Sequence, residues 1–332
     1  MKPAIAKLGY VALQSSNMDA SLHFFQEVIG LELTEQIGDT YYLRAWGDFQ
    51  HHTLSIAPGE TGRVTHIGFR TKRADDVALF AKQLGKKGIE IEPIAAWSTP
   101  GIGEAIRFNA PSGHRLELYY DIERPVVEES RRSVLKNQTY KSYNKGISPR
   151  RLDHINIHTD ANSKETYKFF TEELGFRINE AIETEEGDIL AGWMSVTALV
   201  HDVALVTHEK LETTARFHHI SYWQDNSGDL LRAADICKEH GLQIIGPGKH
   251  SISQAIYLYV IDPGSGCRVE LFTGGYLIFE PDWETVVWRP EERAFGNTYW
   301  GDSITGNPLI LPTIDATGTK KSISVPPIEV GG

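Results

Sequence analysis

The sequence contains two stretches of similar pattern, Leu8-Gly9-Tyr10-Val11-Ala12-Leu13 and Leu152-Asp153-His154-Ile155-Asn156-Ile157. Both copies are apolar runs that predict a strand, and the apolar-periodic run that ends at a glycine after each of them predicts a helix. Further stretches recur in the same order at a period of about 150 residues, which predicts two tandem domains of one fold. These are His66-Ile67-Gly68-Phe69 with His219-Ile220-Ser221-Tyr222, and Arg115-Leu116-Glu117-Leu118 with Arg268-Val269-Glu270-Leu271.

Each predicted domain divides once more. The order of strand, amphipathic helix and several short strands begins at Leu8 and again at Val64. The predicted fold class is therefore α+β, with two tandem domains that each contain two βαβββ modules. We expect helices over residues 19–30, 75–88 and 229–241, and strands over residues 257–261 and 268–272.

The domain limits follow from shifts in composition. Residues 1–122 form the predicted N-terminal domain, and residues 151–288 form the C-terminal domain. Residues 123–150 are charged and polar and contain two prolines, which is typical of a linker. Residues 289–332 form a predicted tail. Beyond Trp300 this tail is rich in Pro, Gly, Ser and Thr, so we expect it to run extended over the surface.

The charge balance argues against two classes of partner. The 332 residues include 33 Lys and Arg against 44 Asp and Glu, a net charge of −11. An acidic chain lacks the positive surface that nucleic acids and anionic membranes attract, so neither is an expected partner. No apolar run reaches the roughly 18 residues of a membrane helix, and residues 1–15 lack the apolar core of a signal peptide. The expected location is the cytoplasm.

The cysteines and the short motifs exclude several kinds of chemistry. Only Cys237 and Cys267 occur, which excludes a disulfide framework and a cysteine-based zinc site. Neither cysteine has a sequence neighbour that would activate it as a nucleophile. The sequence also lacks the glycine-rich and serine motifs of nucleotide-binding proteins and hydrolases.

The two copies differ at positions that could bind a metal. The second copy has His154, His219 and Glu270 where the first has Tyr10, His66 and Glu117. Two imidazoles and one carboxylate can occupy one face of an octahedral ion such as Fe(II) and leave positions open for substrate and oxygen. The C-terminal copy is therefore the candidate metal-binding one. Taken singly, a histidine on a strand is more often a satisfied core or surface residue than a metal ligand, and the spacing of the three is not a local motif.

The second copy also resembles a known family. Gly248-Lys249-His250, Tyr257-Leu258-Tyr259, Asp262-Pro263 and His218-His219-Ile220 are similar to motifs of the type I extradiol ring-cleavage dioxygenases of the vicinal oxygen chelate superfamily. The resemblance runs from about Ala6 to about Trp300. The turn between Pro263 and Glu270 is one residue longer than is usual in the family, and a glycine-rich turn can absorb such an insertion.

This resemblance implies the roles of the site residues. It implies that His154, His219 and Glu270 bind Fe(II) or, in some relatives, Mn(II), that O2 is the co-substrate, and that a catechol is cleaved in aromatic compound catabolism. The N-terminal domain is then non-catalytic, and the protein is expected to be a homo-oligomer, either a tetramer or a dimer. The remaining implied residues are His201, His250 and Tyr259 as catalytic groups, with Asn156 and Trp193 beside the bound oxygen or ring.

The substrate class is narrowed by Ile245, which stands where relatives that take the acidic homoprotocatechuate have an arginine. We therefore expect neutral catechols, such as catechol, alkylcatechols or 2,3-dihydroxybiphenyl. Two alternatives stay open at this point. A glyoxalase-like isomerase would need the metal ligands but not His201, His250 and Tyr259, and a metal-free binding protein would not need His154.

The remaining histidines are expected to have no role in the site. His218 precedes a predicted ligand in a strand, so its side chain should point to the opposite face. His51 and His52 lie in the first copy, where no tightly bound metal is expected. A solvated position is expected for the others, which are His23, His114, His158, His208 and His240.

Overall fold

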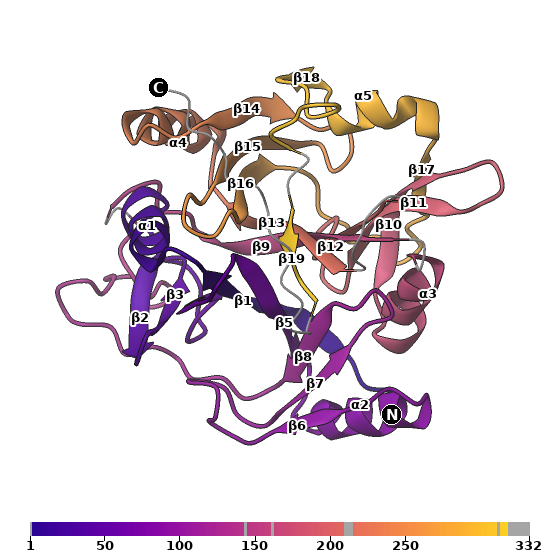
Figure 1. Cartoon of the computed structure of the whole chain (residues 1–332), viewed down its shortest axis with the longest axis horizontal. Coiled ribbons are helices and arrows are strands. Elements are labelled where there is room, and N and C mark those ends of the chain that lie inside the picture. The colour runs from indigo at the N-terminus through magenta and orange to yellow at the C-terminus, as the bar shows by residue number, and fades with distance from the viewer. Residues whose placement is uncertain (1, 143–144, 161–162, 209–214, 311–312, 318–332) are drawn as a thin grey trace.

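The computed structural model describes residues 2–142, 145–160, 163–208, 215–310 and 313–317. In Figure 1 the N-terminal half of the chain, drawn in indigo to magenta, lies below the C-terminal half, drawn in pink to yellow. Within the described residues, the helices are all too short or too polar to cross a membrane.

The N-terminal half consists of two modules with the predicted order of elements. The first is β1 (Ile5–Ser15), α1 (Met18–Leu22), η1 (His23–Val28), β2 (Glu32–Ile37), β3 (Thr40–Arg44) and β4 (Leu54–Pro58). The second is β5 (Arg63–Thr71), α2 (Asp75–Lys86), β6 (Glu92–Ile94), β7 (Ala105–Asn109) and β8 (Arg115–Tyr119).

The C-terminal half repeats this order, which confirms the four βαβββ modules. Its first module is β9 (Arg151–Thr159), α3 (Ser163–Lys168), η2 (Phe169–Glu173), β10 (Arg177–Glu183), β11 (Ile189–Ser195) and β12 (Val203–Thr207). Its second is β13 (Ala215–Trp223), α4 (Ser227–Glu239), β14 (Ile244–Lys249), β15 (Ala255–Ile261) and β16 (Arg268–Gly274).

The strand pairing is the same in both halves. The first and last strands of a module lie parallel, as in β1 with β4 and β9 with β12, because the helix crosses over between them. The two modules of a half join through antiparallel first strands, β1 with β5 and β9 with β13. In the C-terminal half the strand order is β10-β11-β12-β9-β13-β16-β15-β14. The strands β9, β13 and β16 thus lie near its centre, and β15 follows next to β16.

The first helix of each half turns into a π-helix where the sequence has paired phenylalanines. The π-helical segments are His23–Val28 and Phe169–Glu173, and both phenylalanines of each pair are buried. A π-helix has a wider turn than an α-helix and so presents a different set of side chains to the core. The N-cap of the first helix is Asn17, whose side chain accepts from the Ala20 amide, two residues before the predicted start.

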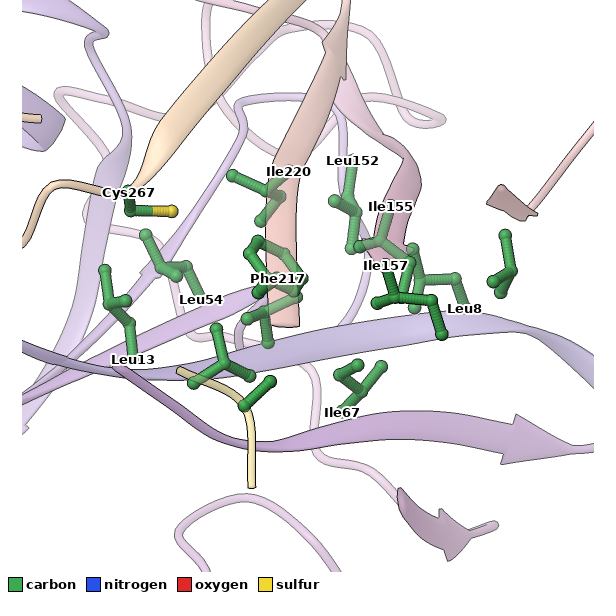
Figure 2. Packing of buried hydrophobic residues seen from close by; sticks show 14 of the residues in the cluster. Leu8, Leu13, Leu54, Ile67, Leu152, Ile155, Ile157, Phe217, Ile220 and Cys267 are labelled. Carbon is green, nitrogen blue, oxygen red and sulfur yellow. The ribbon is translucent and has the colours of Figure 1, made fainter. Parts of the chain in front are cut away.

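One hydrophobic core joins the two halves. Figure 2 shows Leu8, Leu13 and Ile67 from β1 and β5 facing Ile155 and Phe217 from β9 and β13. All these side chains are almost fully buried, and burial of apolar area contributes about 25 cal/mol per Å². This shared core therefore fixes β9 and β13, which carry two of the predicted metal ligands.

The C-terminal segment does more than run over the surface as predicted. It begins with β17 (Val286–Trp288), the last element of the predicted C-terminal domain, and the predicted tail then contains η3 (Pro290–Glu292), α5 (Arg293–Asn297), β18 (Trp300–Gly301) and β19 (Ile314–Asp315). β17 extends the sheet beside β10, and β19 pairs with β13 and bridges to Arg63 of the other half. Residues 318–332 of the predicted tail lie outside the described residues. The limits of domains, linker and tail stay a prediction.

Candidate metal centre

Three strands of the C-terminal sheet bring His154, His219 and Glu270 together. They lie on β9, β13 and β16, and their candidate ligand atoms are all within 4.8 Å of one another. The Glu270 Oε2 atom is 2.8 Å from His154 Nε2 and 3.3 Å from His219 Nε2. All three side chains are buried. The sheet thus gathers two imidazoles and one carboxylate from three strands, as the sequence predicted.

The donor set fits a divalent cation. Among the described residues, neither Glu270 Oε2 nor His219 Nε2 finds a hydrogen-bond partner, although both atoms are buried. A buried carboxylate oxygen or imidazole nitrogen without a partner costs free energy of folding, and a bound cation removes this cost. Two imidazole nitrogens and a carboxylate suit Fe(II) and Mn(II).

Without a cation the pKa values of the cluster diverge. Burial alone would lower the pKa of His154, but the hydrogen bond to Asp153 and the nearby charge of Glu270 outweigh it and raise this pKa to about 9. His219 contacts fewer carboxylates, so burial prevails and lowers its pKa to about 4. Burial raises the pKa of Glu270, but the two imidazoles outweigh that effect and bring it well below its ordinary value.

In the equivalent cluster of the N-terminal half, side chains of the protein bind both oxygens of the buried carboxylate of Glu117. Tyr10 donates a hydrogen bond of 2.6 Å to Glu117, and its hydroxyl oxygen is 2.7 Å from His66 Nε2. Arg107 donates to the other carboxylate oxygen of Glu117 at 2.7 Å. The first copy therefore provides its buried carboxylate with a phenol and a guanidinium.

The other predicted site residues line the same cavity as the three ligands, a cavity of about 410 Å³. His201 lies in the loop between β11 and β12, and the centroid of its ring is 4.0 Å from that of the His154 ring. Asn156 lies on β9, and its side-chain oxygen is buried without a hydrogen-bond partner. Trp193 on β11 belongs to an apolar cluster at the cavity wall. The structure therefore brings all eight predicted site residues together.

His250 and Tyr259 form a pair beside the cluster. His250 Nδ1 donates to the Asn297 carbonyl, and its Nε2 atom lies 3.2 Å from the Tyr259 hydroxyl and 3.5 Å from Glu270 Oε1. Tyr259 is opposite Glu270 in the antiparallel pair β15/β16, so the longer turn after Pro263 has not disturbed the register. Burial, followed by the charge of Glu270, raises the pKa of Tyr259 well above its ordinary value.

The prediction that His218 points away from the site is wrong. The pairing of β13 with β9 shifts between Phe217 and His219, which marks a β-bulge at His218. A bulge interrupts the alternation of side chains, so His218 lines the cavity and lies next to His219, with the two Nδ1 atoms 2.7 Å apart. The sequence carries no signal for a bulge at this position.

Surface positions were also wrongly predicted for several other histidines. His158 and His114 are buried, and His208 is half-buried. His158 and His208 line the cavity, where the His158 ring stacks on the His218 ring at a centroid distance of 4.6 Å. His23 and His240 are exposed, as expected.

Sequence reasoning missed most of the cavity wall. One side of it is apolar, with Ile182, Ala191, Val206 and Ile252. A further part, including Ile304 and Ile310, comes from the segment that was predicted to be a surface tail. Apolar residues within a Pro- and Gly-rich stretch were the available signal. The cavity thus combines the polar cluster with one apolar wall, and polar side chains such as Arg293 and Thr305 also line it.

Comparisons with known proteins agree with this geometry. Residues 64–123 match the family model "Catechol 2,3-dioxygenase-like N-terminal domain", and residues 151–271 match "Glyoxalase/Bleomycin resistance protein/Dioxygenase superfamily". The chain is 48% identical to a manganese-dependent 2,3-dihydroxybiphenyl 1,2-dioxygenase of Geobacillus genomosp. 3, over 93% of this chain and 98% of that protein. It is 34% identical to a metapyrocatechase of Geobacillus stearothermophilus, over 93% and 97%.

Solved structures give the same result. The crystal structure of homoprotocatechuate 2,3-dioxygenase from Arthrobacter globiformis superposes with a TM-score of 0.80 at 27% sequence identity. The match covers 94% of this chain and 92% of that one.

Proposed function

Since the chain belongs to the extradiol ring-cleavage dioxygenases, which open a catecholic ring with O2, we propose that it cleaves a neutral catechol at a single metal ion held by His154, His219 and Glu270. The observation that carries this proposal is the buried cluster itself, in which two imidazoles and a carboxylate converge beside a cavity that has one apolar wall. The other predicted groups, His201, His250 and Tyr259, lie around the same cavity.

The bound metal would supply a common point of attachment for the catechol oxygens and O2, and so couple the electron donor to the acceptor. Fe(II) and Mn(II) both suit this donor set. Mn(II) is favoured because the relative with 48% identity is named as manganese-dependent, whereas another relative with 22% identity is named as iron-dependent. Metal analysis of anaerobically purified protein tests this choice.

His201 is the proposed proton donor on the oxygen side. Its ring is almost fully buried, lies against the ring of His154 and lines the cavity that holds the metal cluster. A buried imidazole that keeps a donor and an acceptor nitrogen can pass a proton without carrying a charge for long. Asn156, whose side-chain oxygen has no hydrogen-bond partner among the described residues, offers an acceptor in the same cavity.

His250 and Tyr259 are proposed to orient the substrate oxygens. Because His250 Nδ1 is committed to the Asn297 carbonyl, its Nε2 atom is free to face Tyr259 and the catechol. The phenol of Tyr259 stays protonated at neutral pH and can donate to an oxygen on which negative charge develops. A glyoxalase-like isomerase on the same fold would need the metal ligands but not His250 and Tyr259, so this pair favours the dioxygenase.

The cavity supports an aryl-substituted substrate. Its volume of about 410 Å³ and its apolar wall of Ile182, Ala191, Val206 and Ile252 leave space for a second ring beyond the catechol. The same relative with 48% identity is named for 2,3-dihydroxybiphenyl. We therefore propose 2,3-dihydroxybiphenyl or a comparable neutral catechol, in the breakdown of aromatic compounds.

A direct assay tests the proposed function. The purified protein is loaded with Mn(II) or Fe(II) and mixed with 2,3-dihydroxybiphenyl, catechol or homoprotocatechuate in air. We expect O2 uptake together with a yellow ring-opened product, fastest with 2,3-dihydroxybiphenyl. A clear preference for homoprotocatechuate would contradict the neutral substrate, and the absence of product with every catechol would contradict the function.

The proposal also includes a homo-oligomer, either a dimer or a tetramer, in the cytoplasm. Large apolar side chains on the C-terminal segment, such as Phe279 and Phe295, are more than half exposed and could be covered by a second copy. Both cysteines are free, which fits a reducing compartment. Light scattering of the purified protein and fractionation of the source cells test these two points.

A further inference from the structure

Each of the two histidines in the metal cluster is preceded by a residue that contacts its Nδ1 atom. The Nδ1 atom of His154 donates to Asp153 Oδ2 at 2.9 Å, and the Nδ1 atom of His219 lies 2.7 Å from His218 Nδ1. Consecutive residues of a regular strand point to opposite faces, so such contacts need a local irregularity.

β-Bulges provide this irregularity at both places. In the pairing of β9 with β13, Leu152 is opposite Tyr222 and Ile155 is opposite Ile220, so β9 has one extra residue at Asp153 and His154. On β13 the extra residue is His218. Bulges turn adjacent side chains toward one side and re-aim them, and here each bulge places a partner behind a ligand.

The partner of His154 is itself held in place. The second carboxylate oxygen of Asp153 accepts a hydrogen bond from Arg151, whose guanidinium lies 4.9 Å from the ring centre of Trp223. Asp153 is buried, so its charge is compensated by Arg151 on one side and by His154 on the other. With Nδ1 committed to Asp153, His154 can present only Nε2 to the cluster.

The partner of His219 works through a chain of hydrogen bonds. His218 Nε2 lies 2.9 Å from the Ile310 carbonyl, which can only accept, so this nitrogen carries the hydrogen. In a neutral His218 ring the Nδ1 atom is then an acceptor, and His219 Nδ1 must donate to it. His219 Nε2 is thereby left without a hydrogen, and its lone pair faces Glu270.

The N-terminal half serves as an internal comparison. Its β5 strand has the same bulge, where Thr65 Oγ1 lies 3.1 Å from His66 Nδ1. At the other bulge, Gly9 stands before Tyr10, and a Cβ atom on Gly9 would lie 2.0 Å from the Tyr119 hydroxyl. The carboxylate is thus present only in the half that has the metal cluster.

We propose that Asp153 and His218 are positioning residues, which fix His154 and His219 with Nε2 toward the metal and so strengthen metal binding. This inference rests on the proposed metal site. Neither residue is assigned contact with the reacting atoms. Asp153 does not line the substrate cavity but a separate cavity of about 470 Å³ on the other side of His201.

The first test measures Mn(II) affinity by competition with a chelator, without substrate. Asp153→Asn keeps the size of the side chain but removes its charge, so we expect Mn(II) to bind about 10- to 100-fold more weakly, as for other residues that hold a metal ligand. Arg151→Gln should have a smaller effect, and the double variant should bind no more weakly than Asp153→Asn alone. Asp262→Asn removes a buried carboxylate that contacts no ligand and is the matched control.

The second test uses His218. A glutamine can accept from His219 and donate to the Ile310 carbonyl, so His218→Gln should retain most of the Mn(II) affinity, whereas His218→Leu should lose about 10-fold or more. Pulsed electron paramagnetic resonance of bound Mn(II) counts the coordinated imidazoles. We expect two in the native protein and a weakened contribution in Asp153→Asn and His218→Leu.

The outcomes separate this inference from the proposed site. If the native protein binds neither Mn(II) nor Fe(II), the metal site itself is wrong, and this inference is wrong with it. If the native protein binds Mn(II), and the folded Asp153→Asn and His218→Leu variants bind it with native affinity and unchanged imidazole signals, only the positioning roles are wrong. Additive effects of Arg151→Gln and Asp153→Asn would show that Arg151 does not act through Asp153.

Discussion

The guanidinium of Arg107 lies 2.7 Å from the carboxylate of Glu117, and it compensates this buried charge in the half of the molecule that has one histidine fewer in its cluster. The register of β7 with β8 puts Arg107 opposite Glu117, just as β15 and β16 put Tyr259 opposite Glu270. A fixed cation in one half thus occupies the position of a phenol in the other.

The first prediction is that the N-terminal half can be converted into a metal site. Tyr10→His combined with Arg107→Tyr restores two imidazoles and frees the carboxylate of Glu117. We expect elemental analysis to find two Mn(II) ions per chain in the double variant and one in the native protein. Tyr10→His alone should stay at one, because Arg107 still pairs with Glu117. If the double variant folds but binds a single Mn(II) ion, the prediction that the N-terminal half can become a metal site is wrong.

The second prediction separates metal binding from proton transfer. His219→Ala should abolish metal retention, because the cluster then has one imidazole and one carboxylate left. His201→Phe should retain the metal but lose about 10²- to 10⁴-fold in turnover, the usual contribution of a general acid or base. Elemental analysis and O2 uptake on the same samples measure both. An active His219→Ala protein would overturn the ligand assignment.

The third prediction concerns the apolar wall of the cavity. Ala191→Leu adds three carbon atoms next to Ile182 and Ile252, where the second ring of an aryl catechol is expected. We expect kcat/KM for 2,3-dihydroxybiphenyl to fall about 10-fold or more and that for catechol to change less than about 3-fold. Ala198→Leu, outside this cavity, is the control. Equal losses for both substrates would place the second ring elsewhere.

The fourth prediction is a pH dependence of stability. His114 is buried and contacts Ser112 and the Arg216 carbonyl of the other half. Burial lowers its pKa to about 4, against 6.5 in the unfolded chain. Between these values the unfolded state binds more protons, so the free energy of unfolding falls as the pH falls, by roughly 3 kcal/mol from pH 7 to pH 4.

Chemical denaturation of the native protein and of His114→Gln at pH 7 and pH 4.5 measures this effect. Glutamine cannot take up a proton, so the variant should lose less stability than the native protein when the pH is lowered. The same loss in both proteins would assign the acid sensitivity to other groups.

The metal cluster could be predicted because the chain carries its own reference copy. The histidines and the carboxylate of the second copy can be interpreted only when the two halves are aligned, because the first copy has Tyr10 at the position of His154. The roles of His201, His250 and Tyr259 came from the family resemblance, because nothing in their local spacing indicates that they meet.

The errors have two physical origins. His218 was assigned to the wrong face because a β-bulge depends on how β13 pairs with β9, which strand periodicity does not contain. The role of the C-terminal segment was missed partly because several of its contacts use backbone carbonyls, such as those of Leu309 and Ile310. Every residue has a backbone carbonyl. The pattern of side chains in a sequence therefore does not indicate which carbonyls will accept hydrogen bonds from distant residues.

These carbonyl contacts have a consequence for how the enzyme can change. Arg268 donates to the carbonyl of Leu309, and His218 Nε2 lies 2.9 Å from the carbonyl of Ile310. Neither contact uses the side chain of Leu309 or Ile310. These two contacts can therefore remain when the side chains of Ile304 or Ile310 change, and the Asp302 side chain, which accepts from the Gly246 amide, anchors the segment further. Substrate range can drift there, in evolution or in a directed library, while the duplicated sheets and their shared core remain as they are.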